Sequence, residues 1–484
     1  MSLKSKTIKS AKWSAISSLT VIIFGFLQMT ILSRILSTNE FGILSVMTVF
    51  FILTDALADF GISNSIIQQS DISIEQMSTL YWVNILFGIF LFVAFFVLSD
   101  PIAAWLNIPD VSSLIKMTSL AFIIIPHGQQ YRALLQKELN FNVLGKLESI
   151  AYIIGFCSAV LIAIENKSAI SAVWGYLIIV SCRTMLLSAV GRKLYKPKFI
   201  FKLKSVKSNL VFGFYLTADS IVNYINSNMS TILIAKILGP VLTGGYSITY
   251  NVAVNPPSKI SPIITRVLFP AFSKIQNDPQ KLKLNFFKLL SLIGFVNFPA
   301  LFGLLFLSKE FILLSFGVKW IFINNIMMIL CLAGVLRAAA NPIGALLMAK
   351  ARMDLSFKFN LAKIFIFAPI LYFGAVLYGL IGVALGFLLC QVVNTIFSYF
   401  LLLKPIFGQC LVEYFKSLLL PFLHVIPMCI VLYVMNIYWK QNNMMLMVFS
   451  IKILSGAFVY LLTMYLSKNA LVRELRGICW GFIK

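Results

Sequence analysis

The sequence predicts an all-α, polytopic membrane protein with fourteen transmembrane helices and cytoplasmic N- and C-termini. Three observations predict this class. The 484-residue chain is 60% hydrophobic and only 12% charged, whereas soluble domains are about 25% charged. Apolar stretches of about 20 residues, the length that crosses a bilayer, recur fourteen times along the chain. The basic residues between them are distributed asymmetrically.

The fourteen predicted spans follow one another with short connections. They cover residues 13–33, 41–67, 79–98, 111–131, 147–164, 169–190, 210–235, 244–270, 289–307, 322–348, 359–378, 382–403, 418–437 and 444–466. Four lysines precede the first span, so that this region resembles a secretory signal peptide. Its apolar run is too long for a signal peptide and lacks an A-x-A cleavage site, so we expect it to remain as the first helix.

Basic residues collect in alternate connections. With the N-terminus inside, the cytoplasmic segments hold 27 Lys and Arg, and the outside loops hold six. Lys and Arg concentrate in the cytoplasmic loops of membrane proteins. This bias supports the fourteen-span count and the position of both termini.

An internal repeat predicts the domain organisation. Residues 31–36 (ILSRIL) resemble residues 233–238 (LIAKIL), and residues 133–137 (ALLQK) resemble residues 345–350 (ALLMAK). Units of six spans enter the membrane in the same direction, so an axis along the membrane normal should relate the two units. The predicted parts are an N-lobe (1–190), a basic linker (191–209), a C-lobe (210–404) and a C-terminal hairpin with the tail (405–484).

The linker stretch from Arg192 to Lys207 carries seven Lys or Arg and no acidic residue. Together with the net charge of +24, it would suggest nucleic acid in a soluble protein. Because the same basic excess recurs in the other inside segments, we expect no nucleic-acid partner. The charge should hold the linker at the anionic cytoplasmic membrane surface, and its length should let the halves move.

Enzymatic motifs are missing from the sequence. It contains two His and no G-x-S-x-G, P-loop or H-E-x-x-H pattern, and its longest outside loop, near residues 308–321, is too short to fold as a catalytic domain. The seven scattered Cys include no C-x-x-C, which argues against a disulfide framework or a metal site. We therefore expect a protein that is not an enzyme and binds no metal.

Polar side chains recur every three or four residues within several predicted spans, so each set shares one helical face. Ionisable groups at this depth are costly unless they face water or a partner, which makes each a candidate for function. We expect these faces to line one aqueous cavity between the halves. They comprise Asp55 and Asp59; Asp219, Asn223, Asn226 and Ser230; Asn255, Lys259, Pro262 and Arg266; and Arg337 and Asn341.

Prolines predict where helices break near this cavity. Asn255-Pro256-Pro257 and Pro262 should interrupt the span 244–270, and Pro342 should act similarly in the span 322–348. Backbone carbonyls freed at membrane depth are tolerated only against a cavity or protein. The breaks therefore indicate the binding region.

The charges at membrane depth differ in sign between the halves. We predict that the second half supplies an anion site, formed by Lys259, Arg337, Arg266, Asn255 and Asn341. Asp55 and Asp59 are candidates for coupling a proton or cation, and Asp219, Asn223 and His127 are further polar candidates in the cavity. The alternative is pairing within the protein, for instance of Asp219 with Lys259. Lys363, Arg266 and Arg183 are predicted near the inner membrane surface, so we expect their side chains to extend to that surface. For His127 we expect a structural hydrogen bond in preference to a proton relay.

Six stretches resemble one known family. They are residues 1–17, 34–42, 57–68, 126–130, 216–221 and 341–352. The chain resembles the polysaccharide transporter branch of the multidrug/oligosaccharidyl-lipid/polysaccharide flippases, with the colanic acid exporter type closest. The resemblance runs to the last span and fades in the C-terminal hairpin.

This resemblance implies two six-helix bundles with two extra helices, a central cavity and alternating access. It implies export of undecaprenyl-pyrophosphate-linked oligosaccharide across the bacterial inner membrane for exopolysaccharide, capsule or O-antigen assembly. The expected partners are the lipid-linked oligosaccharide, membrane lipids, and a polysaccharide polymerase with its export machinery. We expect a functional monomer without a cofactor, coupled to H⁺ or Na⁺. A drug or cation antiporter of the same superfamily and a membrane-embedded polymerase are the alternatives.

Overall fold

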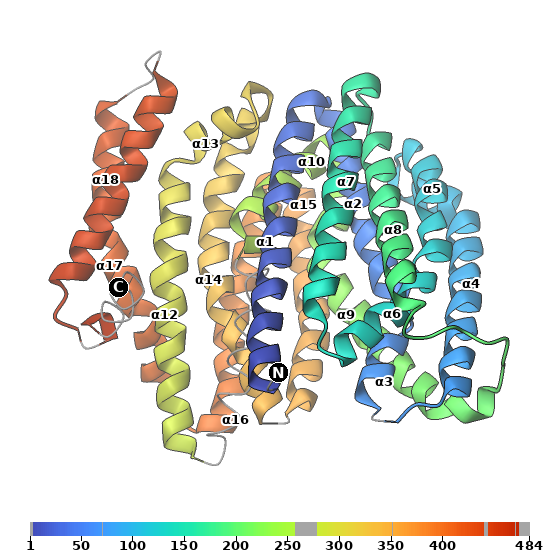
Figure 1. The fold of residues 1–484 in the computed structure, drawn as a ribbon. Coiled ribbons are helices and arrows are strands. Elements are labelled where there is room, and N and C mark those ends of the chain that lie inside the picture. Colours follow the sequence, from blue (N-terminus) through green and yellow to red (C-terminus); the bar gives the residue numbers. More distant parts are fainter. Residues whose placement is uncertain are drawn as a thin grey trace. The chain divides into compact units, whose positions relative to one another are not determined.

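The structure is a computed structural model and describes residues 3–69, 71–256, 278–350, 352–439, 444–469 and 471–473. These residues are almost entirely helical (Figure 1). They divide into two compact units, Met1–Gly244 and Gly245–Lys484. The predicted lobe boundary at residues 191–209 stays a prediction, since this division by contacts does not test it.

Long helices follow one another through both units. Up to residue 244 they are α1 (Leu3–Ile35), α2 (Thr38–Leu57), α3 (Ile62–Gln68), α4 (Ile74–Leu106), α5 (Asp110–Ile124), α6 (Pro126–Lys137), α7 (Phe141–Asn166), α8 (Ile170–Gly191), α9 (Lys207–Leu238) and the start of α10 (Pro240–Ala253). The later helices are α12 (Pro279–Phe306), α13 (Ser308–Ser315), α14 (Asn324–Ala349), α15 (Met353–Ser398), α16 (Lys404–Phe407), α17 (Leu411–Tyr438) and α18 (Met445–Leu466).

Ten helical segments of the described residues are long and apolar enough to cross a membrane, or eleven when α5 and α6 are taken as one bent span. One of the ten, Asp354–Phe407, contains a chain reversal at Gly379 (φ 59°, ψ −141°). A Cβ added to Gly374 would lie 2.6 Å from the carbonyl oxygen of Gly382, so the two arms of α15 pack closely on either side of Gly379. The structure thus supports an all-helical, multi-pass membrane fold, and the count of fourteen stays a prediction.

Helix junctions recur at the repeat found in the sequence. Thr38 begins α2 and Pro240 begins α10, 202 residues later, while Lys137 ends α6 and Ala349 ends α14, 212 residues later. A Cβ on Gly42 would lie 2.0 Å from the Pro240 carbonyl oxygen. Only glycine fits there, so the first turn of α2 lies directly against the start of α10.

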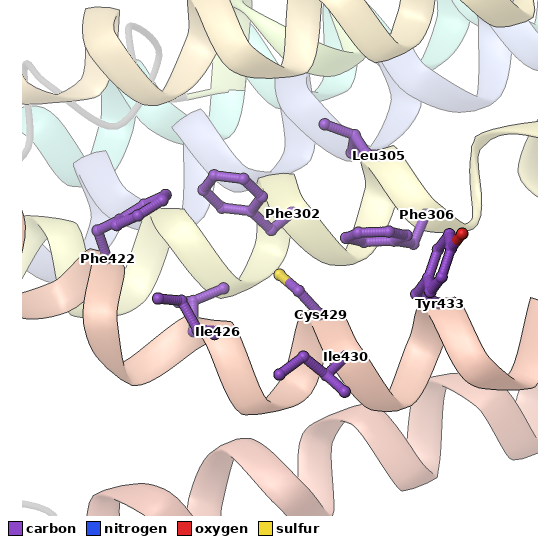
Figure 2. Close-up of a pocket in the computed structure, with 9 residues that line it drawn as sticks. Phe302, Leu305, Phe306, Phe422, Ile426, Cys429, Ile430 and Tyr433 are labelled. Carbon is purple, nitrogen blue, oxygen red and sulfur yellow. The ribbon is translucent and has the colours of Figure 1, made fainter.

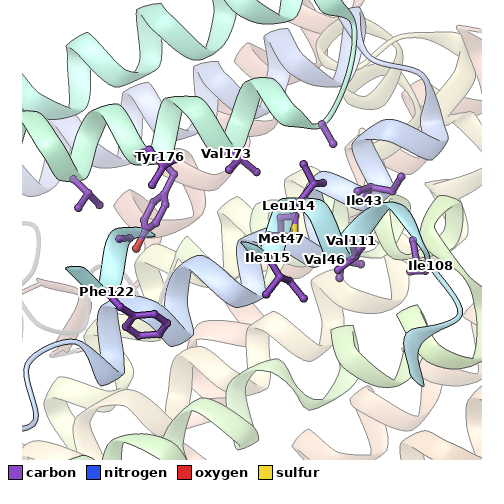
Figure 3. Close-up of a cluster of buried hydrophobic side chains, with 14 of the residues drawn as sticks. Ile43, Val46, Met47, Ile108, Val111, Leu114, Ile115, Phe122, Val173 and Tyr176 are labelled. Atoms are coloured by element: carbon purple, nitrogen blue, oxygen red, sulfur yellow. The ribbon is translucent and has the colours of Figure 1, made fainter. Parts of the chain in front are cut away.

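The core of the first unit is built from α2, α5 and α8 (Figure 3). Met47 from α2, Val111 and Ile115 from α5, and Val173 from α8 are each at most 1% exposed. Tyr176 of α8 stacks on Phe51 of α2, with ring centroids 4.4 Å apart. This packing fixes the helices that carry the polar residues described next.

Candidate functional site

The second membrane span is broken between α2 and α3. Phe60 (φ 44°) and Gly61 (φ 66°) both have left-handed backbone conformations. A Cβ on Gly61 would lie 2.7 Å from Cα and from the carbonyl oxygen of Gly213 in α9. The break therefore lies against α9, and both glycines are needed for the close approach of the two backbones.

Asp59 lies at this break and satisfies backbone groups that the break exposes. Its carboxylate accepts hydrogen bonds from the Ser63 backbone N–H at 3.2 Å and from the Ser63 hydroxyl at 2.7 Å. These bonds cap the first turn of α3 with a negative charge, which a helix N-terminus favours. The sequence predicted Asp59 as a functional residue, and the structure adds this local role.

The fourth predicted span is bent as well. α5 and α6 meet at Pro126 with an angle of 49°. His127 follows the bend, and its Nδ1 lies 2.9 Å from the Ile123 carbonyl oxygen. Its ring makes an edge contact with Tyr81, with centroids 6.3 Å apart. These contacts agree with the structural role that the sequence favoured for His127.

The two broken spans enclose a polar cavity of about 310 Å³ within the first unit. The Ser63 hydroxyl lies 3.4 Å from the Gln129 carbonyl oxygen and links α3 to α6. The cavity is lined by Asp55, Ala56, Asp59, Gly61, Ser63, Asn64, Gln129, Arg132, Gln136, Leu216, Thr217 and Ser220. Both predicted aspartates thus line one cavity, together with residues of α6 and α9.

Arginine side chains balance part of the negative charge around this cavity. Arg183 of α8 donates to Asp55 at 3.2 Å, and Arg132 of α6 pairs with Glu148 of α7 at 3.0 Å. The predicted extension of Arg183 to the membrane surface is wrong, since its side chain is only 19% exposed and faces Asp55. The sequence assigned Arg132 to an inside loop because the predicted span ended at residue 131, whereas α6 continues to Lys137.

The predicted polar face of α9 divides between surface and interior. Asp219 and Asn223 are exposed and bound to each other, with Asn223 Nδ2 donating to the Asp219 carboxylate at 3.0 Å. Ser230 is buried at 4% exposure. The cavity receives Thr217 and Ser220 from this helix, residues that the sequence did not single out.

Of the predicted anion site, only part lies in the described residues. Lys259, Pro262 and Arg266 fall outside them, as does the side chain of Asn341. Asn255 donates to the Asn251 side chain at 2.7 Å, and Asn251 donates to the Ser247 carbonyl at 2.9 Å. Asn255, two residues beyond the end of α10, thus continues a row of hydrogen-bonded polar side chains that starts at Ser247.

Arg337 and its neighbour Pro342 lie on α14. Arg337 is partly exposed. The helix continues through Pro342 to Ala349, so the predicted interruption at that proline is wrong. Loss of one backbone donor does not end a helix when the residues on both sides keep helical geometry.

The second unit holds two further features that the sequence left unassigned. An apolar cavity of about 320 Å³ lies between α12 and α17 and is lined by Phe302, Phe306, Cys429 and Tyr433, among others (Figure 2). Nearby, Lys452 of α18 is 1% exposed and bonds to Glu310 and to the Asn436 side chain, both at 2.6 Å. A lysine inside an apolar span was itself a signal of such a buried network.

Sequence comparisons place this chain among proteins of polysaccharide biosynthesis. It matches the family described as "Polysaccharide biosynthesis protein" over residues 31–325. It is 55% identical to an "Uncharacterized membrane protein in cps region" of Klebsiella pneumoniae, covering 99% of this chain and 98% of the relative. It is 52% identical to "Lipopolysaccharide biosynthesis protein WzxC" of Escherichia coli (strain K12), covering 91% and 89%.

Solved structures share the fold. The lipid II flippase MurJ in an inward closed conformation aligns with a TM-score of 0.75 at 16% identity, covering 93% of this chain and 97% of that chain. An inward-facing multidrug transporter of the MATE family and the MOP superfamily aligns with a TM-score of 0.61 at 11% identity, covering 80% and 97%. At these identities the likeness establishes the fold. With the two close relatives, it confirms the resemblance seen in the sequence: the chain belongs to the polysaccharide biosynthesis protein family, as a multi-pass protein of the bacterial inner membrane with a flippase-like fold.

Proposed function

We propose that this protein is a flippase that carries undecaprenyl-pyrophosphate-linked oligosaccharide from the inner to the outer leaflet, for exopolysaccharide, capsule or O-antigen assembly. The observation that carries the proposal is the polar cavity between two broken spans, in a chain of this family. A charged, sugar-bearing headgroup crosses hydrocarbon only at prohibitive cost. A polar cavity replaces its water while the lipid tail stays in the bilayer.

Alternating access would move the substrate. In this proposal fourteen spans form two six-helix lobes and a C-terminal hairpin, with both termini cytoplasmic, and rocking of the lobes exposes the cavity to each side in turn. The broken spans α2–α3 and α5–α6 support it, because irregular backbone at membrane depth is tolerated against a cavity. The protein acts without forming or breaking covalent bonds.

The charged residues have two roles in this proposal. Lys259, Arg337 and Arg266 hold the pyrophosphate, while Asp55 and Asp59 take a proton or Na⁺ that couples transport to the ion gradient. The cavity lining supports the second assignment, since both aspartates border the same space. A polymerase and an export complex would receive the flipped product.

Deletion of the gene tests the proposal in cells. The strain should accumulate lipid-linked repeat units on the cytoplasmic side and lose surface polysaccharide. Intact surface polysaccharide without accumulated repeat units would rule the proposal out.

Reconstitution separates it from a drug or cation antiporter; one structural neighbour with this fold is a multidrug resistance transporter. Liposomes containing the purified protein should move labelled lipid-linked oligosaccharide and leave cationic dyes behind. Dye transport with no movement of the oligosaccharide would assign the protein to the antiporters instead.

A further inference from the structure

The connection between α8 and α9 is an ordered strap, defined here as residues 195–206. It lies along the first turns of α4. Lys198 N–H donates to the Ser78 hydroxyl and Lys202 N–H donates to the Thr79 hydroxyl, both at 3.1 Å. Trp82 Nε1 donates to the Lys198 carbonyl at 3.0 Å.

Side chains at the two ends of the strap secure it further. Tyr195 is 8% exposed and its hydroxyl lies 2.7 Å from the Ser78 hydroxyl. Val206 is fully buried, and Gln76 Nε2 donates to the Ser205 carbonyl at 3.0 Å. The sequence suggested a linker whose length allows movement; instead, the strap is bound to the first unit.

The outward side of the strap alternates lysines with large apolar side chains. Phe199 is 91% exposed, the highest exposure of any large hydrophobic side chain among the described residues, and Phe201 is 51% exposed. Lys196 and Lys198 precede Phe199, Lys204 follows Phe201, and all three lysines are exposed. The Phe199 ring contacts the Trp82 ring, with centroids 4.8 Å apart and the ring planes inclined by 60°.

The strap lies at the depth where a membrane span leaves the hydrocarbon. α4 has 33 residues, about 50 Å of helix, whereas the hydrocarbon core is about 30 Å thick. Its first turns carry Glu75, Gln76 and Ser78 before the apolar run begins with Tyr81 and Trp82. The strap contacts these turns, where aromatic side chains and lysines meet lipid headgroups.

We propose that the strap is a binding surface for anionic lipid headgroups, with Phe199 and Phe201 inserted among the lipids and Lys196, Lys198 and Lys204 bound to their phosphates. Charge complementarity selects this partner, because the exposed lysines are unopposed by acidic residues within the strap. Glu75, at the start of α4, pairs with Lys202 of the strap at 2.9 Å. An exposed phenylalanine beside a span end fits a lipid surface, because its ring can insert among the lipids while the neighbouring lysines reach the phosphates.

Photo-crosslinking tests the insertion. Phe199 is replaced by p-benzoylphenylalanine in the full-length protein, and the product is placed in nanodiscs of phosphatidylglycerol and phosphatidylcholine. Illumination should attach lipid at residue 199. A probe at Lys167, an exposed residue outside the strap, serves as the positional control. If native membranes yield an adduct with a protein and nanodiscs yield no lipid adduct, the surface binds a protein and the proposal fails.

The lysines are tested by lipid selectivity. Removing one lysine should lower the preference for phosphatidylglycerol over phosphatidylcholine by about fivefold. Lys196→Gln/Lys198→Gln/Lys204→Gln should therefore abolish the enrichment of phosphatidylglycerol measured by native mass spectrometry. Salt at about 0.5 M, where the Debye length is about 4 Å, should abolish the enrichment of the unmodified protein as well.

A matched control removes three exposed lysines elsewhere, as Lys167→Gln/Lys281→Gln/Lys309→Gln. It should keep the enrichment of phosphatidylglycerol. Equal loss in both triple variants would mean that total charge attracts the lipid and that the strap does not, which overturns the proposal. Phe199→Ser/Phe201→Ser keeps every lysine and should weaken retention of both lipids.

Discussion

Arg183 Nη2 on α8 donates to Asp55 Oδ1 on α2 at 3.2 Å, joining two helices of the same core. The Arg183 side chain is 19% exposed and that of Asp55 is 48% exposed. Asp55→Asn leaves the arginine charge without its partner, and we expect a loss of about 1–3 kcal/mol of stability, between the values for exposed and buried pairs. Thermal unfolding in detergent measures it.

A double-mutant cycle separates the pair from its surroundings. Asp55→Asn/Arg183→Gln should be more stable than Asp55→Asn, because the unpaired charge is gone. Additive losses would show that the two residues act independently.

Asp59→Asn removes the negative charge of the Asp59 side chain and keeps the cap on the first turn of α3. The amide oxygen still accepts the Ser63 N–H, so stability should change by less than about 1 kcal/mol. If the carboxylate takes part in coupling, lipid-linked oligosaccharide transport should fall by about tenfold or more, a change equivalent to 1.4 kcal/mol. Glu165→Gln, at an exposed position in the last turn of α7, is the control and should transport normally. Full transport by Asp59→Asn would exclude the carboxylate from coupling.

Gly61→Ala should destabilise the protein strongly. The new Cβ would lie 2.7 Å from the Gly213 backbone and the residue would keep a φ of 66°. Strain of this kind costs about 1–3 kcal/mol before the clash is counted. Gly344→Ala, where a Cβ would meet nothing within 4 Å, should be neutral or stabilising by up to about 1 kcal/mol. Similar unfolding temperatures for the two variants would contradict the close contact of the α2–α3 break with α9.

Lys452→Gln should unfold the C-terminal hairpin more readily. Glu310 and Asn436 would each lose a partner at 2.6 Å, and breaking a buried pair costs about 3–5 kcal/mol. Lys116→Gln, whose partner Asp100 has a side chain 67% exposed, should cost less than about 1 kcal/mol. Protease resistance of α17 and α18 reports the difference, and equal resistance would show that the buried pair adds no stability.

Arg337→Ala and Lys259→Ala test the proposed anion site. Each should lower export of lipid-linked oligosaccharide while the protein still reaches the membrane in normal amount, because a lost cation weakens phosphate binding. Lys281→Ala, an exposed lysine at the start of α12, is the control. Unchanged export in both variants would refute the assignment.

Several features followed from the sequence because they depend on local composition and periodicity. Apolar runs of membrane length produced the all-helical, multi-pass fold, and the paired stretches at 31–36 and 233–238 located helix junctions that the structure places 202 residues apart. Asp55 and Asp59, four residues apart, were expected on one helical face. Instead, α2 ends at Leu57 and Asp59 lies at the break, although both residues border one cavity.

Tertiary structure alone decided which partners these residues meet. Asp55 faces Arg183, 128 residues away, and Lys452 reaches Glu310 across 142 residues; no local period encodes such pairings, because they depend on how distant helices pack. The basic linker shows the same division. Its charge was evident from the sequence, but its fixed course along α4 arises from hydrogen bonds to Ser78, Thr79 and Trp82, which exist only once the helices have assembled.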